Sequence, residues 1–389
     1  ITAVLVLSIA SGNAGWVSGP LANSAAADSV AYIDVTPDAL LTGNPQEYTY
    51  QSLPNNSPPA PGFVSTHRGR CFTIPSETPT QLWYSQTFIP GGGVGYGFNS
   101  LLTQNIDQAG GDCVALCSMD DKLVILSQTR VYYMQGDGPD AFGANSNYSA
   151  PSLLTADVGC ISPTSVVLMA QGVMFQSQKG IYLAGRDLSC SYIGASVESF
   201  VQGNTVTSAV LMPDRNEVRF GLSNGNIVVY QDLFQQWYVI QGWGANATIW
   251  QGQYVFAEAD GAPFVESTGA TTDGGAAINW TAQTAWISLS GLQGYQRVSR
   301  FGVLGSSANP ITITTAYNYD LTNTDPNYTY TPNPANPEQF RAWIGQQLSG
   351  SINFTFTGQG FQMLEDLSLE LGGIRGIMRL GPAQTGHGG

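Results

Sequence analysis

Short alternating segments recur along the first two thirds of the chain. Apolar and polar positions alternate through residues 172–183 and again through residues 216–230, and a turn divides each segment into two halves. A period of two marks a half-buried β-strand, and the Asn224-Gly225 pair in the second segment is a strong hairpin signal. The pattern therefore predicts antiparallel β-hairpins.

The aromatic residues that close these segments are evenly spaced. Four tyrosines follow one another at intervals of 48, 50 and 48 residues, namely Tyr84, Tyr132, Tyr182 and Tyr230. Weaker copies around Tyr32 and Phe264 extend the series to six units. Four-stranded units of ~40–50 residues, repeated four to eight times, are typical of a β-propeller. We therefore predict an all-β chain with a propeller of about six blades over residues 1–270, in which the four tyrosines occupy equivalent blade positions. An array of β-sandwiches is the alternative architecture.

The repeat stops after about residue 269, and a second domain is expected there. Longer alternating strands are predicted at residues 277–289, 296–304, 311–319, 351–357 and 364–371. Alternation without a helical period predicts an additional β-sandwich-like C-terminal domain over residues 271–389, with the first and last of these strands in one unit. One short helix is predicted near residues 337–347.

Charge is scarce along the chain and mostly negative. Charged residues make up 10% of the sequence, against ~25% in typical globular domains. The 13 basic residues stand against 27 acidic ones, the net charge is −14, and only Lys122 and Lys179 are lysines. This balance disfavours non-specific DNA wrapping and docking on anionic membranes. The apolar residues 1–10 are too short to span a bilayer and no cation precedes Arg68, so neither a membrane span nor a signal peptide is predicted.

Carboxylate pairs that could perform acid–base chemistry are not evident in the sequence. Asp120-Asp121 and Glu365-Asp366 are adjacent, so on strands their side chains would point to opposite faces. Turn or surface positions are expected for both pairs. No catalytic residue is therefore predicted.

Three further patterns could carry chemistry, and each has a simpler interpretation. Residues 271–275 come close to the Asp-box turn of sialidase propellers, but they occur once and an ordinary hairpin is favoured. Residues 136–142 resemble a single calcium-binding Gly/Asp repeat, and a lone copy is a loop. Cys113 and Cys117 are loosely spaced and have only His67 and His387 to complete a site, so buried thiols are favoured over a metal. We predict no metal, no cofactor and no enzyme activity.

An ordered series of short motifs runs along the chain. It includes HRGRCF at 67–72, QLWYS at 81–85, KLVIL at 122–126, KGIY at 179–182 and TAWISL at 284–289. The series resembles that of tail nozzle and packaged-DNA stabilisation proteins of short-tailed bacteriophages (podoviruses), over about residues 28–380. The resemblance implies a virion tail protein that forms a propeller-based ring, usually a hexamer. The ring would lie below portal or adaptor proteins and near needle, fibre or spike proteins, where it would retain packaged DNA and conduct it during ejection.

Charge fits a channel through which double-stranded DNA passes without specific binding, because an acidic wall repels phosphates. More Asp and Glu than Arg or Lys are expected on channel-facing loops. Four arginines are expected at subunit or neighbour contacts, namely Arg297, Arg300, Arg375 and Arg379. The competing hypothesis is a carbohydrate-binding or glycan-cleaving propeller, an adhesin or a glycosidase. It requires a concave cluster of aromatic residues with paired carboxylates.

Overall fold

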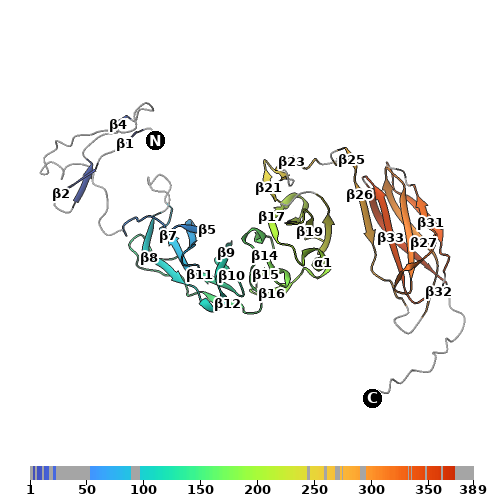
Figure 1. The fold of residues 1–389 in the computed structure, drawn as a ribbon, viewed down its shortest axis with the longest axis horizontal. Helices are drawn as coiled ribbons and strands as arrows, with labels where there is room; N and C mark the ends of the chain where they lie inside the picture. The colour runs from blue at the N-terminus through green and yellow to red at the C-terminus, as the bar shows by residue number, and fades with distance from the viewer. Residues whose placement is uncertain are drawn as a thin grey trace, which may run out of the picture. The chain divides into compact units, whose positions relative to one another are not determined.

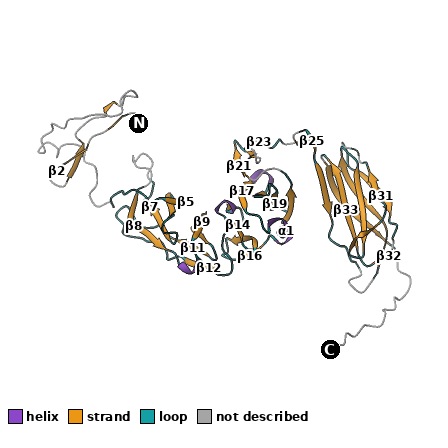
Figure 2. Cartoon of the chain, in the orientation of Figure 1, coloured by secondary structure: helices purple, strands orange, loops and turns teal. Residues whose placement is uncertain are grey.

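A computed structural model describes most of the chain from residue 53 to residue 372. The described residues are 53–88, 97–242, 246–257, 261–267, 272–273, 275–289, 295–331, 333, 335–346, 348–360 and 362–372, together with short strands between residues 3 and 22. The chain divides into two compact units, Ile1–Glu266 and Ser267–Gly389. Strands dominate both units, and α1 (Glu198–Val201) is the α-helix of the described residues (Figures 1 and 2).

The first unit contains a series of antiparallel sheets whose strand order follows the chain. The first sheet is β5 (Pro61–His67), β6 (Arg70–Pro75), β7 (Gln81–Ser85) and β8 (Phe98–Asn105). The second is β9 (Cys113–Met119), β10 (Lys122–Ser127), β11 (Val131–Gln135) and β12 (Ser152–Thr155). The third is β13 (Val167–Leu168), β14 (Gly172–Ser177), β15 (Gly180–Gly185) and β16 (Cys190–Tyr192). The fourth is β17 (Val206–Met212), β18 (Glu217–Leu222), β19 (Ile227–Gln231) and β20 (Gln236–Ile240).

A three-stranded sheet follows, made of β21 (Asn246–Trp250), β22 (Gln253–Ala257) and β23 (Pro263–Val265). Nearer the N-terminus, β1 (Ala3–Val4) pairs with β4 (Leu21–Ala22), and β2 (Leu7–Ala10) pairs with β3 (Asn13–Trp16). Consecutive four-stranded sheets with this strand order are the blades of a β-propeller. The predicted all-β, propeller-based fold class is confirmed.

The tyrosine repeat falls at equivalent positions in the four complete blades. Its members lie on the third strand of each blade, on β7, β11, β15 and β19: Tyr84, Tyr132, Tyr182 and Tyr230. Phe264 likewise lies on the third strand of the three-stranded sheet. The copy around Tyr32 lies outside the described residues. The spacing of 48 to 50 residues therefore reports one blade per repeat.

Neighbouring blades share their hydrophobic cores. Leu82 of the first blade and Ile125 of the second belong to one cluster, and Val124 of the second blade packs in another cluster with Phe175 of the third. The third and fourth blades, and then the fourth and fifth sheets, share clusters in the same way. A single blade cannot bury both of its faces, so each face depends on the next sheet in the chain.

Two packed sheets form the second unit. One contains β26 (Asn279–Gln283), β33 (Ile352–Gln359), β28 (Ile311–Tyr317) and β29 (Asp320–Thr324), with β30 (Tyr328–Tyr330) also paired to β28. The other contains β31 (Glu338–Trp343), β27 (Gln296–Ser307), β32 (Leu348–Ser349) and β34 (Gln362–Leu371). Phe301 of the second sheet packs on Phe354 of the first, with ring centroids 5.2 Å apart. The unit is the predicted β-sandwich, and the first and last predicted strands lie within it.

The helix predicted near residues 337–347 is wrong. The segment forms strand β31, which pairs with β27. Gln339, Arg341 and Trp343 are exposed, whereas Phe340 and Ala342 pack against the core. This period of two is that of a strand, and pairing with β27 decides the outcome over local propensity.

Candidate functional site

The adjacent carboxylates lie where chemistry is not expected. Asp120 occupies the β9–β10 turn with a left-handed φ of 54° and forms an ion pair with Arg186. Asp121 is paired with the neighbouring lysine at 2.6 Å. Glu365 and Asp366 lie exposed on β34. These positions match the turn and surface placement expected for both pairs.

Two other carboxylates do come together, around the buried guanidinium of Arg219. Its Nε and Nη2 donate to Oε2 of Glu217 at 3.1 and 2.9 Å, and its Nη1 donates to Oε2 of Glu266 at 2.8 Å. Arg215 donates to the other oxygen of Glu266 at 2.7 Å, and the Tyr238 hydroxyl donates to Glu217 at 2.8 Å. The Arg219 side chain is 1% exposed, and both carboxylates are nearly buried.

This Arg219 cluster has the charge state of a structural ion-pair network. A glycosidase requires one carboxylic acid whose pKa is raised, so that it can donate a proton. Burial alone would raise the pKa of Glu266, but hydrogen bonds and charge from Arg219 and Arg215 outweigh burial and hold the pKa below its usual range. Glu266 is therefore ionised at neutral pH. The cluster joins β18 to the residue that follows β23.

His67 and Ser118 form a serine–histidine contact without the third group of a triad. Nδ1 of His67 lies 2.7 Å from Oγ of Ser118, whereas the buried Nε2 has no hydrogen-bond partner in the described part of the chain. Burial, assisted by the charge of Arg68, lowers the pKa of His67. A nucleophilic serine needs a histidine that another group orients. This pair lacks that group among the described residues.

All five cysteines are free thiols, and burial raises the pKa of each. The pKa values of Cys117 and Cys190 rise to about 11. Such thiols are protonated at neutral pH and react slowly. Among the described residues, no group of three or more His, Cys, Asp or Glu side chains is arranged to hold a metal ion.

The two loop motifs serve as turns in the described residues. Thr272–Asp273 (β24) pairs with Ala276–Ala277 (β25), which is a hairpin, although Thr271 and Gly274 lie outside the described residues. In the Gly/Asp loop, Asp140 accepts hydrogen bonds from the backbone N–H groups of Phe142 and Ala144 at 2.9 and 3.0 Å. Those bonds lower the pKa of Asp140, whose carboxylate closes its own loop.

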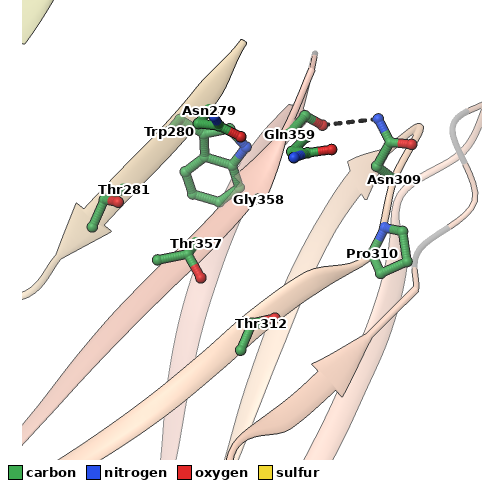
Figure 3. A pocket seen from close by; sticks show the side chains of 9 residues that line it. All are labelled: Asn279, Trp280, Thr281, Asn309, Pro310, Thr312, Thr357, Gly358 and Gln359. Atoms are coloured by element: carbon green, nitrogen blue, oxygen red, sulfur yellow. Dashed lines mark hydrogen bonds between the residues drawn. The ribbon is translucent and has the colours of Figure 1, made fainter. Parts of the chain in front are cut away.

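A polar cleft opens in the second unit at the end of the sheet where β26 and β28 begin and β33 ends (Figure 3). Its volume is about 420 Å³, within the ~300–1,000 Å³ range of small-molecule sites. Nine residues line the cleft and none carries a charge. Asn309 donates from Nδ2 to the backbone oxygen of Gln359 at 3.0 Å and so ties the β27–β28 loop to the end of β33 (Figure 3).

Beside the cleft, Trp280 packs against the core of the sandwich and over Gly358 on the facing strand. A Cβ atom at Gly358 would lie 2.7 to 2.8 Å from Cζ2, Cε2 and Nε1 of the indole, so only glycine leaves room for the ring. The indole nitrogen is buried and has no hydrogen-bond partner in the described residues. Buried indole N–H groups usually have a partner.

The sequence interpretation identified neither the Arg219 cluster nor the cleft. Glu217 and Arg219 share one face of β18, and Trp280 begins an alternating strand, so local signals existed. Their partners Glu266 and Gly358 are 47 and 78 residues away from Arg219 and Trp280 in the sequence. Four arginines were expected at subunit contacts. The guanidinium carbon of Arg300 lies 3.6 Å from the ring centre of Trp343, in its own sheet. Residues 375 and 379 lie outside the described residues.

No helix in the described residues has the length and apolar character needed to cross a membrane.

No protein-family profile and no curated protein matches the chain. Among solved structures, the chain is similar to PorZ of the type-IX secretion system of Porphyromonas gingivalis, at 12% identity and a TM-score of 0.35, over 56% of this chain and 27% of PorZ. It is also similar to an exo-β-1,3-galactanase from Phanerochaete chrysosporium, at 10% identity and a TM-score of 0.30, over 81% and 97% of the two chains. BamB from Moraxella catarrhalis matches at 10% identity and a TM-score of 0.30, over 52% and 68%. The chain thus spans about a quarter of the length of PorZ, and similarity at this level assigns no function.

Proposed function

We propose that this chain is a structural protein of a bacteriophage tail, a nozzle or head-to-tail channel component that retains packaged DNA and conducts it during ejection. The observation that carries the proposal is the place of the motif series in the fold. QLWYS is strand β7, KLVIL lies on β10 and KGIY begins β15. The series that resembles nozzle proteins therefore follows successive blades, the architecture that the resemblance implies.

The distribution of charge supports passage of DNA without binding. Seven cations of the described residues are paired with carboxylates of the same chain, namely Arg68, Lys122, Arg130, Arg186, Arg215, Arg219 and Arg300. Arg70 is buried and donates to the backbone oxygens of Ser85 and Pro139. Cations that are neutralised within the chain contribute little to phosphate binding, which depends on the release of counterions.

Exposed apolar turns supply contacts for assembly. Leu233 and Phe234, in the β19–β20 turn, are 70% and 66% exposed, and Trp250, at the β21–β22 turn, is 66% exposed. The strands of each sheet run alternately up and down in chain order, so the first and third strands end at the same side of the sheet. The β19–β20 turn follows a third strand and the β21–β22 turn follows a first strand, so both turns lie at the same end of their sheets. Clusters of exposed large apolar side chains mark protein–protein contacts. We assign these turns to contacts between subunits or with neighbouring tail proteins.

The glycan-cleaving alternative has less support, because the paired carboxylates of the first unit are bound to Arg219 and Arg215. Mass photometry and negative-stain imaging of the purified protein test the proposal. A ring, expected to be six-fold, with an axial hole wide enough for a DNA duplex is the expected result. A monomer at micromolar concentration, or hydrolysis of a polysaccharide that is lost in Glu217→Gln, would overturn the proposal.

A further inference from the structure

We propose that the outer edge of strand β34 is the docking site of residues 375–380 of the same chain, which add to the sheet as one more antiparallel strand. The inference concerns the second unit and makes no use of the channel function. β34 is ten residues long and pairs along its length with β27, whereas no described strand pairs with its other side. A long unpaired edge is a template on which another chain can pair, so native proteins usually cover such edges.

The side chains of β34 form an apolar face and an acidic face. Leu364, Leu367 and Leu369 pack against the core of the sandwich. Asp366 and Glu370 alternate with them, are exposed, and point to the opposite face of the sheet. A strand that pairs well with this edge therefore offers apolar residues on the core face and cations on the outer face.

Residues 375–380, which lie outside the described part of the chain, have this pattern in their sequence. RGIMRL places Arg375 and Arg379 on one face of an extended strand, and Met378 and Leu380 on the other. Residues 373–389 contain no Asp or Glu. Pro382 cannot donate to a strand ladder, so the strand should end before it. The segment thus complements the edge of β34 in both charge and polarity.

The connection to β34 sets the register. The backbone N–H of Gly372 donates to the carbonyl oxygen of Arg297 at 2.8 Å, so pairing with β27 continues through this residue. The chain can therefore turn back at Gly373. A two-residue loop whose first residue is glycine is the type II′ hairpin turn. With residues 373 and 374 as the loop, Ser368 lies opposite Arg379.

This register brings matching side chains together. Met378 lies opposite Leu369, so apolar side chains continue along the core face. Arg379 lies diagonally between the two exposed carboxylates of β34, at a distance that a long side chain can span. The new ladder ends just before the β-bulge at Glu365, and bulges often end strand pairing.

Covering by the same chain is favoured over covering by a second copy. The segment begins a few residues beyond the end of β34, so its local concentration at the edge is on the order of millimolar or higher. A separate copy would have to compete with it. The docked segment would thus prevent the edge of β34 from pairing with other chains.

Paired cysteines in the full-length protein test this register. Ser368→Cys with Arg379→Cys puts two thiols at opposite positions, where Cα atoms are ~4.5–5.5 Å apart and a disulfide can form. All five native cysteines lie in the first unit, and burial raises the pKa of each, so they compete little. We expect mild oxidation to give a disulfide within one chain, seen at monomer mobility on a non-reducing denaturing gel and located by peptide mass spectrometry.

The matched control is Ser368→Cys with Met378→Cys. A shift of one residue turns the second thiol to the other face of the sheet, so this pair should form a disulfide about tenfold more slowly or not at all. Equal rates for the two pairs, or no disulfide in either, overturn the proposal. Covalent dimers overturn it as well, because a second copy would then occupy the edge.

Hydrogen exchange measures docking without added cysteines. The amides of β34 that face the outer edge should be protected in the intact protein, and Arg379→Glu should speed their exchange about two- to tenfold, because it faces two carboxylates. Arg341→Glu changes an exposed arginine of β31, at the opposite edge of the sheet, and should leave β34 unchanged. Peptides from β28 report whether each variant is folded. Exchange of the outer amides as fast as in an uncovered strand, in the intact protein, overturns the proposal.

Discussion

Replacing Arg219 with methionine tests how much the buried ion network contributes to the first unit. Arg219 forms bonds of 2.8 to 3.1 Å with two carboxylates, and its guanidinium lies 4.6 Å from the ring centre of Tyr254. Methionine fills a similar volume but leaves Glu217 and Glu266 as buried charges with one partner each, Tyr238 and Arg215. Removal of one partner from a buried pair costs about 3–5 kcal/mol of unfolding free energy.

The control is Arg300→Met, a similar arrangement at the surface. Arg300 pairs with Glu370 at 3.7 Å and stacks on Trp343, but its side chain is 37% exposed and that of Glu370 is 60% exposed. Exposed pairs contribute about 0–1 kcal/mol. The two variants therefore differ in burial more than in chemistry, and the expected ratio of their effects is at least three to one.

Urea unfolding read by pulsed hydrogen exchange and mass spectrometry suits this comparison, because peptides from the two units are measured separately. With a urea dependence of ~1–3 kcal/mol per molar, the loss of about 3–5 kcal/mol in Arg219→Met should lower the urea midpoint of blade four by about 1–5 M. Adding Glu217→Gln and Glu266→Gln to Arg219→Met should restore part of the loss, since no unpaired charge then remains buried. Equal midpoint shifts for Arg219→Met and Arg300→Met would refute the reasoning.

Three other measurements probe the first unit. Since burial and Arg68 lower the pKa of His67, the unfolded chain takes up a proton below about pH 6.5 that the folded chain resists. The unfolding free energy should therefore fall as the pH decreases from 6.5, and urea midpoints of His67→Gln should fall less; parallel curves would contradict this. Because burial raises the pKa of Cys117 and Cys190 to about 11, thiol reagents at pH 8 should modify the native protein slowly and the urea-unfolded protein quickly. Rapid labelling of several thiols in the native protein would be the opposite result. Gel-shift titrations with duplex DNA at physiological salt should show no complex at micromolar protein, and a complex with a steep salt dependence would disprove an acidic channel.

Local patterns in the sequence were sufficient to predict the blades. Tyr84 and Tyr132 recur because each blade uses about the same number of residues to cross the same four strands. The Asn224-Gly225 turn and the alternation around it depend only on neighbours in the chain, and both appear in the β18–β19 hairpin. The failure at residues 337–347 has the opposite cause. There the pairing of Phe340 with Val303 is a long-range contact that no local propensity encodes.

The candidate sites depend on contacts of this second kind. Glu266 reaches Arg219 only when the fifth sheet packs on the fourth blade, and Thr357 joins Thr281 and Thr312 only in one register of three strands. A shift of that register by one residue would turn each threonine to the other face of the sheet. Sequence reasoning could identify the residue types but could not bring them together.

The two clusters also differ in what happens to their polar groups when the chain folds. Arg219 and its carboxylates leave water, so each charge must find a partner within the protein or the fold loses several kcal/mol. The hydroxyls of Thr281, Thr312 and Thr357 line an open cleft, where bonds to water replace bonds within the protein at little cost. The saturated partners of Arg219 therefore indicate a role in stability for the first unit.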